Sequence, residues 1–372
     1  MATQQQNIGE VLQFFNEARR PVKSSDRVPG PFPYLGASGT VDYVEGFTHE
    51  GSYLCVSEDG ANLLTRSLPI AWVQDGKFWA NNHLQVLGGV SREHLTFFRY
   101  AIESTNIAAY VTGSAQPKLS KASLSSVKVP KFSRGEEERI GKLLSAIDDK
   151  IVANQTSISK LDEILRALWQ TELSLGSIDG PLSSLASFLN GKAFTNGASG
   201  TGRVVVRIAE MNSGISGKTV FSDFDADPDN EVNPGDLLFS WSGTLMTKRW
   251  PYDQAIVNQH IFKVVPNGQL DLWALRQAID TQLEYFQMIA AGKATTMGHI
   301  KRGDLDQEVE VPVQMSEETN QLGNSLWGLA TSLEIQNLQL ARTRDELLPL
   351  LMSGRITVGE AEDAADEAAS ES

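Results

Sequence analysis

The chain has 372 residues, which is enough for two domains, because a single hydrophobic core rarely grows beyond about 250–300 residues. No apolar run approaches the ~20 residues that cross a bilayer, and the N-terminus lacks the basic-then-apolar order of a signal peptide. The single cysteine, Cys55, excludes an internal disulfide framework. We therefore expect a cytoplasmic, multidomain globular protein without a membrane partner.

The net charge of −14 argues against strong binding of nucleic acid by the chain alone, because such binding depends largely on neutralising phosphates. The charge is unevenly distributed. Residues 105–135 contain five basic and no acidic residues, whereas residues 359–372 contain six acidic and no basic residues. The basic stretch is a candidate for phosphate contacts, although such a run can also be an ordinary solvated surface. The acidic tail, 357–372, is predicted to be disordered.

Residues 1–132 are predicted to form a first mixed α/β module. The glycine-rich stretch 34–39 indicates an exposed loop, and residues 93–111 a helix. Asparagine can pair with adenine, and lysine with guanine or phosphate. The candidate DNA contacts are Ser38, Asn81, Asn82, His83, Lys118 and Lys121. The alternative for the Asn-Asn-His sequence is that it only orders the end of a strand.

Residues 133–173 are predicted to form a long helix. Ser133 and Glu136 have the spacing of a capping box at its start. Residues with alternating steps of four and three follow, as in a heptad seam: Ile140, Leu144, Ile147, Ile151, Asn154, Ile158, Leu161, Leu165 and Leu168.

Residues 174–314 are predicted to form a second mixed module. It has expected strands at 203–208 and 236–240, a loop at 190–202 and a helix at 270–291. Its candidate DNA contacts are Trp241, Ser242, Thr244, Asn258, Gln259, His260, Lys293 and Lys301. Trp241 can equally be a core residue.

Residues 315–356 are predicted to form a second long helix, which ends near Pro349 and Gly354. Its seam runs through Leu322, Leu326, Leu329, Leu333, Gln336, Leu340, Thr343, Leu347 and Leu350. Both seams carry an amide at the fifth of nine positions, Asn154 and Gln336. We expect the helices to form an antiparallel coiled coil in which these amides meet and fix the register. The alternative is that each helix packs only on its own module.

The two halves of the chain are related by an internal repeat. Residues 140–168 align with 322–350 at an offset of 182, and Gly141 then falls on Gly323. Asn81 to Leu84 align with Asn258 to Ile261 at an offset of 177 residues, and Ile8 aligns with Leu182 at an offset of 174. Small changes of offset in one direction are what loop insertions produce. The sequence therefore predicts an α+β protein of two tandem modules, each followed by a long helix.

Catalytic motifs are absent from the sequence. Ser216 to Thr219 resemble the end of a phosphate-binding loop, but Asn212 occupies the position of the first required glycine. There is no paired-cysteine zinc site, metalloprotease helix or nucleophile elbow, and the five histidines lack metal-ligand spacing. We predict a non-catalytic chain without a cofactor or metal, the alternative being an enzyme with unrecognised chemistry.

Two divergent modules that alternate with two similar long helices resemble the specificity subunit of type I restriction–modification enzymes. The most specific sequences are Pro33 to Gly39, Glu58 to Leu63, the two Asn-x-His stretches and Asn233 to Leu238. The resemblance covers residues 8–356. It implies that each module reads one half of a split target in double-stranded DNA. It also implies partners, namely modification subunits that methylate adenine and a restriction subunit that translocates and cuts DNA. The alternative function is a coiled-coil scaffold without sequence readout.

Overall fold

The computed structural model describes residues 4–113, 115–292 and 298–370. These residues divide into two compact units, one formed by residues 4–151 with 339–370 and the other by residues 152–338. Each unit contains one module together with a segment of both long helices, α5 (Arg134–Leu175) and α8 (Glu317–Met352).

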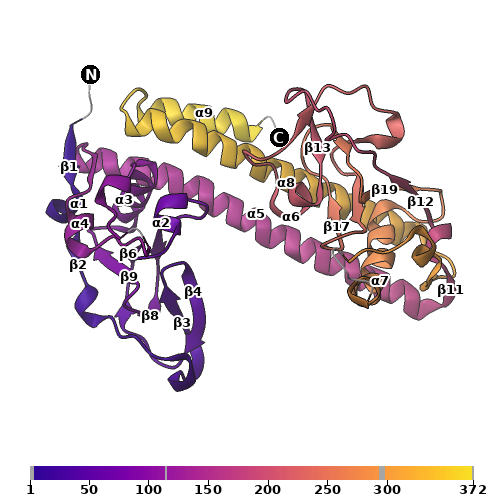
Figure 1. Cartoon of the computed structure of the whole chain (residues 1–372), viewed down its shortest axis with the longest axis horizontal. Helices are drawn as coiled ribbons and strands as arrows, with labels where there is room; N and C mark the ends of the chain where they lie inside the picture. The colour runs from indigo at the N-terminus through magenta and orange to yellow at the C-terminus, as the bar shows by residue number, and fades with distance from the viewer. Residues whose placement is uncertain (1–3, 114, 293–297, 371–372) are drawn as a thin grey trace. The chain divides into compact units, whose positions relative to one another are not determined.

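The first module is built from short strands and one substantial helix, α3 (Figure 1). Its elements are β1 (Gln5–Asn7), α1 (Ile8–Val11), β2 (Gln13–Phe14), β3 (Pro29–Gly36), β4 (Gly39–Val44), β5 (His49–Glu50), β6 (Tyr53–Ser57), α2 (Asn62–Thr65), β7 (Ala71–Gln74), β8 (Lys77–Ala80), β9 (Leu84–Gly88), α3 (Arg92–Ser104), α4 (Lys121–Ser125) and β10 (Lys128–Pro130). They form two four-stranded sheets, in the orders β2-β9-β6-β7 and β4-β3-β8-β5, and the antiparallel pair β1-β10.

The second module has the same topology. Its elements are β11 (Ser177–Pro181), β12 (Ala186–Asn190), β13 (Arg203–Val206), α6 (Ile208–Ser213), β14 (Phe221–Ser222), β15 (Glu231–Val232), β16 (Leu237–Ser240), β17 (Met246–Arg249), β18 (Ala255–Val257), β19 (Ile261–Pro266), α7 (Leu272–Gly292) and β20 (Glu308–Pro312). Its sheets have the orders β12-β19-β16-β17 and β14-β13-β18-β15, with the pair β11-β20. The only parallel pairs among the described strands, β3-β8 and β13-β18, are equivalent. The predicted α+β tandem repeat is therefore confirmed.

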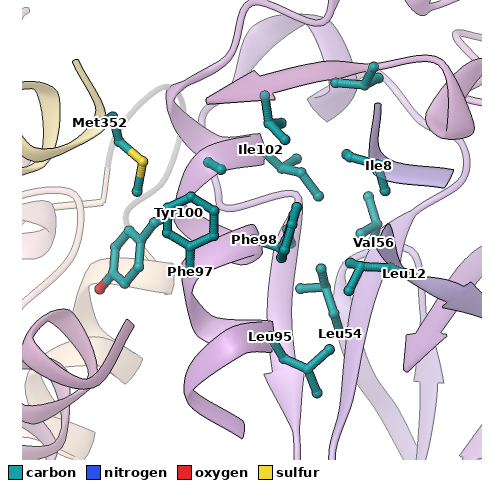
Figure 2. Close-up of a cluster of buried hydrophobic side chains, with 14 of the residues drawn as sticks. Ile8, Leu12, Leu54, Val56, Leu95, Phe97, Phe98, Tyr100, Ile102 and Met352 are labelled. Carbon is teal, nitrogen blue, oxygen red and sulfur yellow. The ribbon is translucent and has the colours of Figure 1, made fainter. Parts of the chain in front are cut away.

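The core of the first unit lies between the β2-β9-β6-β7 sheet, α3 and the helix segments. Figure 2 shows Phe98 of α3 turned toward Leu54 and Val56 of β6, with Ile8 and Leu12 close by. Met352, from the end of α8, belongs to the same cluster and lies on the Tyr100 side of α3. The helix segments are thus an integral part of this core.

Two glycines allow the long helices to approach the modules closely. A Cβ atom at Gly141 of α5 would lie 1.9 Å from the carbonyl oxygen of Glu93, at the start of α3. A Cβ atom at Gly323 of α8 would lie 2.3 Å from the indole of Trp273, at the start of α7. Real Cβ atoms do not come so near to other atoms, so the shared glycines of the repeat mark equivalent helix contacts in the two units.

Within each unit, the segments of α5 and α8 run antiparallel. In the first unit, Asp148 of α5 pairs with Arg344 of α8 across 2.8 Å. In the second unit, Asn154 contacts Gln336, and Glu172, near the end of α5, contacts Ser316, which precedes α8. Residue numbers that rise along one helix therefore fall along the other, as predicted, and the expected meeting of Asn154 and Gln336 is confirmed.

The apolar seams of the long helices do not serve only a coiled coil. Ile140 and Leu144 are buried in the core of the first module, and Leu165 in that of the second. Leu322 and Leu329 were predicted to lie in the seam, yet their side chains are 45% and 49% exposed. The reason is that α8 turns the face carrying Gly323 and Trp327 toward the second module. The alternative that each long helix packs on its own module is thus partly correct.

The predicted loop at residues 34–39 is wrong. Tyr34 and Leu35 lie in β3 with 2% and 0% exposure, and the Tyr34 hydroxyl accepts a hydrogen bond from the Val22 backbone. Only Ala37 and Ser38 form the turn to β4. Burial of these side chains decides the local structure, which the neighbouring glycines had obscured.

The predicted disorder of the acidic tail is also wrong for its described part, because residues 358–370 form helix α9 (Val358–Ser370). Thr357 and Glu360 cap its start, with Thr357 N–H donating to the Glu360 carboxylate over 2.8 Å and Glu360 N–H donating to the Thr357 hydroxyl over 3.3 Å. Val358 and Ala361, one turn apart, are buried in the core of the first unit. Alanine is a strong helix former, so composition alone was a poor guide to disorder here.

Candidate nucleic-acid interface

The Asn-x-His sequence of the second module lies beside the end of β16. The backbone N–H of Trp241 donates to the carbonyl of His260 over 3.0 Å, and that of Gly243 to Gly298 over 2.9 Å. Ile300 N–H donates to the carbonyl of Trp241 over 3.0 Å. Three segments that are distant in sequence, after β16, before β19 and before the 3-10 turn at Arg302–Asp306, are thereby held together.

The first module repeats these hydrogen bonds. Glu58 N–H donates to His83 over 2.9 Å, Gly60 to Pro117 over 3.0 Å, and Leu119 to Glu58 over 2.7 Å. We call this arrangement the strand-end frame. It comprises residues 58–60, 83 and 117–119 in the first module and 241–243, 260 and 298–300 in the second.

The strand-end frame of the first module carries charged side chains. The Glu58 carboxylate accepts one hydrogen bond from Arg19, over 2.6 Å, and lies 3.1 Å from the ammonium of Lys118. Asp59 lies 2.6 Å from Nδ1 of His83. The side chains of Lys118 and His83 are 52% and 47% exposed. This frame therefore presents a cation and an imidazole, each held by a carboxylate, to the surface.

The strand-end frame of the second module carries aromatic side chains instead. The indole of Trp241 lies with its centroid 4.8 Å from His260 and 6.5 Å from His299, and its Nε1 donates to Asn190 over 2.8 Å. A pocket of about 420 Å³ adjoins it, lined by Asn190, Trp241, Phe262, His299, Ile300, Lys301 and Arg302.

His260 has an unusual backbone conformation and a buried ring nitrogen. Its φ of 76° lies in the left-handed region, which non-glycine residues rarely occupy. Its Nδ1 is buried, and no described atom forms a hydrogen bond with it. Strained residues of this kind are found preferentially at functional sites, where the surrounding structure compensates for their cost.

Three of the predicted DNA contacts are buried. Asn81 and Asn258 are 8% and 6% exposed, and Ser242 is 5% exposed. The Asn81 side-chain oxygen accepts a hydrogen bond from His83 N–H over 2.8 Å and so orders the turn into β9. Ser242 pairs with His299 in an isolated bridge that closes the frame. Asn81 and Ser242 thus support the frame from inside, and for Asn81 this agrees with the alternative that the Asn-Asn-His sequence orders the end of a strand.

The other described candidates lie at or near the surface. The exposed ones are Ser38, Asn82, His83, Lys118, Lys121, Thr244, Gln259 and Lys301, while Trp241 and His260 are half-buried. Ser38 lies at the tip of the β3-β4 hairpin, apart from the frame residues in sequence. Lys293 lies outside the described residues. Thus His83 and Lys118 are brought together by one frame, and Trp241 and His260 by the other.

Sequence reasoning did not select Glu58, Asp59 and His299 of the two frames as candidate contacts, nor the neighbouring residues Arg19, Asn190 and Arg302. The internal repeat carried the signal, but the equivalent segments differ in offset. The equivalent residues are separated by different offsets in residue number, namely 183 for Glu58 and Trp241, 177 for His83 and His260, and 181 for Lys118 and His299. Because the side chains at the first and last of these pairs differ, matching residue types could not align them.

No group of three or more histidine, cysteine, aspartate or glutamate residues within 4–113, 115–292 and 298–370 is arranged to hold a metal ion. In the same ranges, no helix has both the length and the apolar character needed to cross a bilayer.

Comparison with known proteins identifies the first module and the start of α5. Residues 3–163 match the family model described as the type I restriction modification DNA specificity domain. This part of the chain is therefore similar to the specificity subunits of type I restriction–modification enzymes. A Haemophilus influenzae protein named as a type I restriction enzyme specificity subunit is 39% identical over 140 residues, which are 38% of this chain and 36% of that relative. The match therefore spans about a third of the relative's length.

The fold of nearly the whole chain also has a solved counterpart. The S subunit of a type I restriction–modification system from M. genitalium aligns with a TM-score of 0.62 over 94% of this chain and 96% of its own, at 15% identity. Identity this low shows the fold alone. The HsdS subunit of Thermoanaerobacter tengcongensis aligns over 95% of this chain with a TM-score of only 0.32 and supports no argument.

Proposed function

We propose that this chain is the DNA-specificity subunit of a type I restriction–modification complex. Each module reads one half of a bipartite target in double-stranded DNA, and partner modification and restriction subunits methylate adenine or cut the DNA. The observation that carries the proposal is the strand-end frame, which occurs in both modules with the same backbone and different side chains. Two modules of one fold that read different half-sites require such an arrangement.

The chain itself is non-catalytic in this proposal, and it acts in the cytoplasm, where its bacterial DNA target lies. Partners are also required for affinity, because the chain has a net charge of −14 and neutralising phosphates is the main source of DNA affinity. Apolar side chains exposed on the long helices, including Ile164, Leu322 and Leu329, support docking of the modification subunits there.

The proposal is tested by mapping methylated adenine throughout a genome with and without this chain, in cells that supply the modification and restriction subunits. We expect a split motif of two half-sites separated by a fixed gap, methylated only when the chain is present. If the subunits assemble on the chain but methylation follows no sequence, the chain is a scaffold. Methyl transfer by the purified chain alone would contradict its non-catalytic role.

A further inference from the structure

The strand-end frames allow equivalent residues of the two modules to be compared position by position. His83 and His260 each accept the backbone hydrogen bond from the residue that follows β6 or β16. Lys121 and Arg302 are each the first residue of a helical turn, α4 in one module and the 3-10 turn at Arg302–Asp306 in the other. Both cations are exposed. At these two positions the modules share their chemistry.

Lys118 and His299 are equivalent but chemically different. Each forms an isolated backbone bridge with the second residue after the strand end, Lys118 with Asp59 and His299 with Ser242. An ammonium group can only donate hydrogen bonds, whereas a neutral imidazole has one donor and one acceptor. The two modules therefore present different hydrogen-bonding groups from the same backbone position.

Given the proposed function, we infer that the frame divides DNA recognition between these two classes of position. Phosphate contacts carry no sequence information, so the residues whose chemistry is common to both modules contact the DNA backbone. These are His83 with His260, and Lys121 with Arg302. Different half-sites need different base-reading groups, and Lys118 with His299 supplies them. Glu58 holds the Lys118 ammonium at 3.1 Å, and two of its three donors remain for acceptors such as O6 and N7 of guanine. Lys118 thus selects guanine in one half-site, while His299 contacts a base of the other half-site.

The test exchanges the differing residues in the full chain, co-expressed with its modification subunits, and maps the methylated motif. Lys118→His should change one base position in one half-site and leave the other half-site and the gap unchanged. His299→Lys should change only the other half-site, toward guanine. In binding assays with the assembled complex, relative affinity for the two bases at that position should shift about ten-fold or more.

Matched controls exchange the shared residues. Lys121→Arg and Arg302→Lys keep the positive charge and should leave the motif unchanged, whereas His83→Ala and His260→Ala should weaken binding to all sequences equally. Thermal unfolding of each variant identifies any that fail to fold.

The inference is overturned if Lys118→His and His299→Lys leave base preference unchanged, or if they weaken binding to every sequence alike. It is also overturned if Lys121→Arg alters the motif. If the unaltered chain directs no bipartite motif, it is the proposed function that fails instead.

Discussion

The side-chain amide of Asn154 donates hydrogen bonds to Gln336, over 2.7 Å, and to Asn337, over 2.9 Å. Asn154 is only 3% exposed, so these bonds satisfy an amide that would otherwise be buried without partners. Polar pairs in an apolar helix interface reduce stability relative to leucine, but they penalise any shift of register that separates them. The contact therefore fixes how α5 and α8 align within this unit.

Replacing Asn154 and Gln336 together with leucine should raise the thermal unfolding midpoint by roughly 2 °C or more, since a buried amide and its half-buried partner give way to apolar side chains. The exposed substitution Gln155→Leu on the same helix is the control and should change the midpoint little. A lower midpoint in the double leucine variant would contradict this account.

Cysteines introduced at Asn154 and Gln336 should form a disulfide under mild oxidation, detected by electrophoresis without reductant. The native Cys55 should not compete, because its burial raises the pKa of its thiol and removes the reactive thiolate. Absence of the cross-link in the folded chain would show that the two helices are not paired in this register.

Gly141→Ala and Gly323→Ala should each destabilise the chain by about 1–3 kcal/mol, because the new methyl groups would overlap Glu93 and Trp273. Gly141→Ala should be the more harmful, since its obstacle is a backbone carbonyl. Gly135→Ala and Gly328→Ala are matched controls in the same helices. Nothing lies within 4 Å of a Cβ at either position, so these substitutions should stabilise by about 0.5–1 kcal/mol. Urea unfolding measures the unfolding free energy of all four variants. Equal changes in all four would show that the long helices do not approach the modules closely at Gly141 and Gly323.

How far the sequence predicts the structure depends on whether the relevant contacts are local or distant. The two long helices and the Asn154–Gln336 contact were predictable, because these helices contain no insertions and keep one offset of 182. The burial of Asn81 and Ser242 was not, because it depends on strands and bridges from remote segments. The frames were missed for a similar reason, since loop insertions change the offset between their three segments.

Arg249 of β17 is 2% exposed and should be the most sensitive charged residue of the second unit. Its guanidinium donates to both Glu334 carboxylate oxygens, over 2.9 and 3.0 Å, and lies 4.7 Å from the ring centroid of Trp327. Arg249→Ala would leave Glu334 without its buried partner and should cost roughly 3 kcal/mol of unfolding free energy. Arg342 pairs with Glu346 but its side chain is 81% exposed, so Arg342→Ala should cost less than about 1 kcal/mol. Similar losses of unfolding free energy in the two variants would contradict the view that the buried pairing of Arg249 with Glu334 stabilises the second unit.

Asp148 should make the first unit sensitive to acid. Burial opposes its ionisation, but the Tyr100 hydrogen bond, the Arg99 charge and the Arg344 hydrogen bond outweigh burial and hold its pKa below the ordinary 3.8. The folded state therefore gains stability from ionised Asp148 above about pH 4 and loses it as pH falls through the lower pKa. At neutral pH, Asp148→Asn should be less stable than the wild type, and the difference should shrink below pH 4. A constant difference across acid unfolding curves would exclude this role.

Lengthening α5 and α8 together should change the gap between the half-sites and leave the half-sites themselves unchanged. Seven residues in each helix add about 10 Å at ~1.5 Å per residue, which corresponds to roughly three base pairs at ~3.4 Å. A heptad nearly preserves the facing of each helix, with a drift of only ~20°, so the segments that pack on the modules keep their contacts. The same seven residues inserted in the exposed loop between Gly197 and Gly200 should leave the gap unchanged. Mapping methylated adenine for both variants decides the matter. A new half-site sequence at an unchanged gap would show that the helices do not set the spacing.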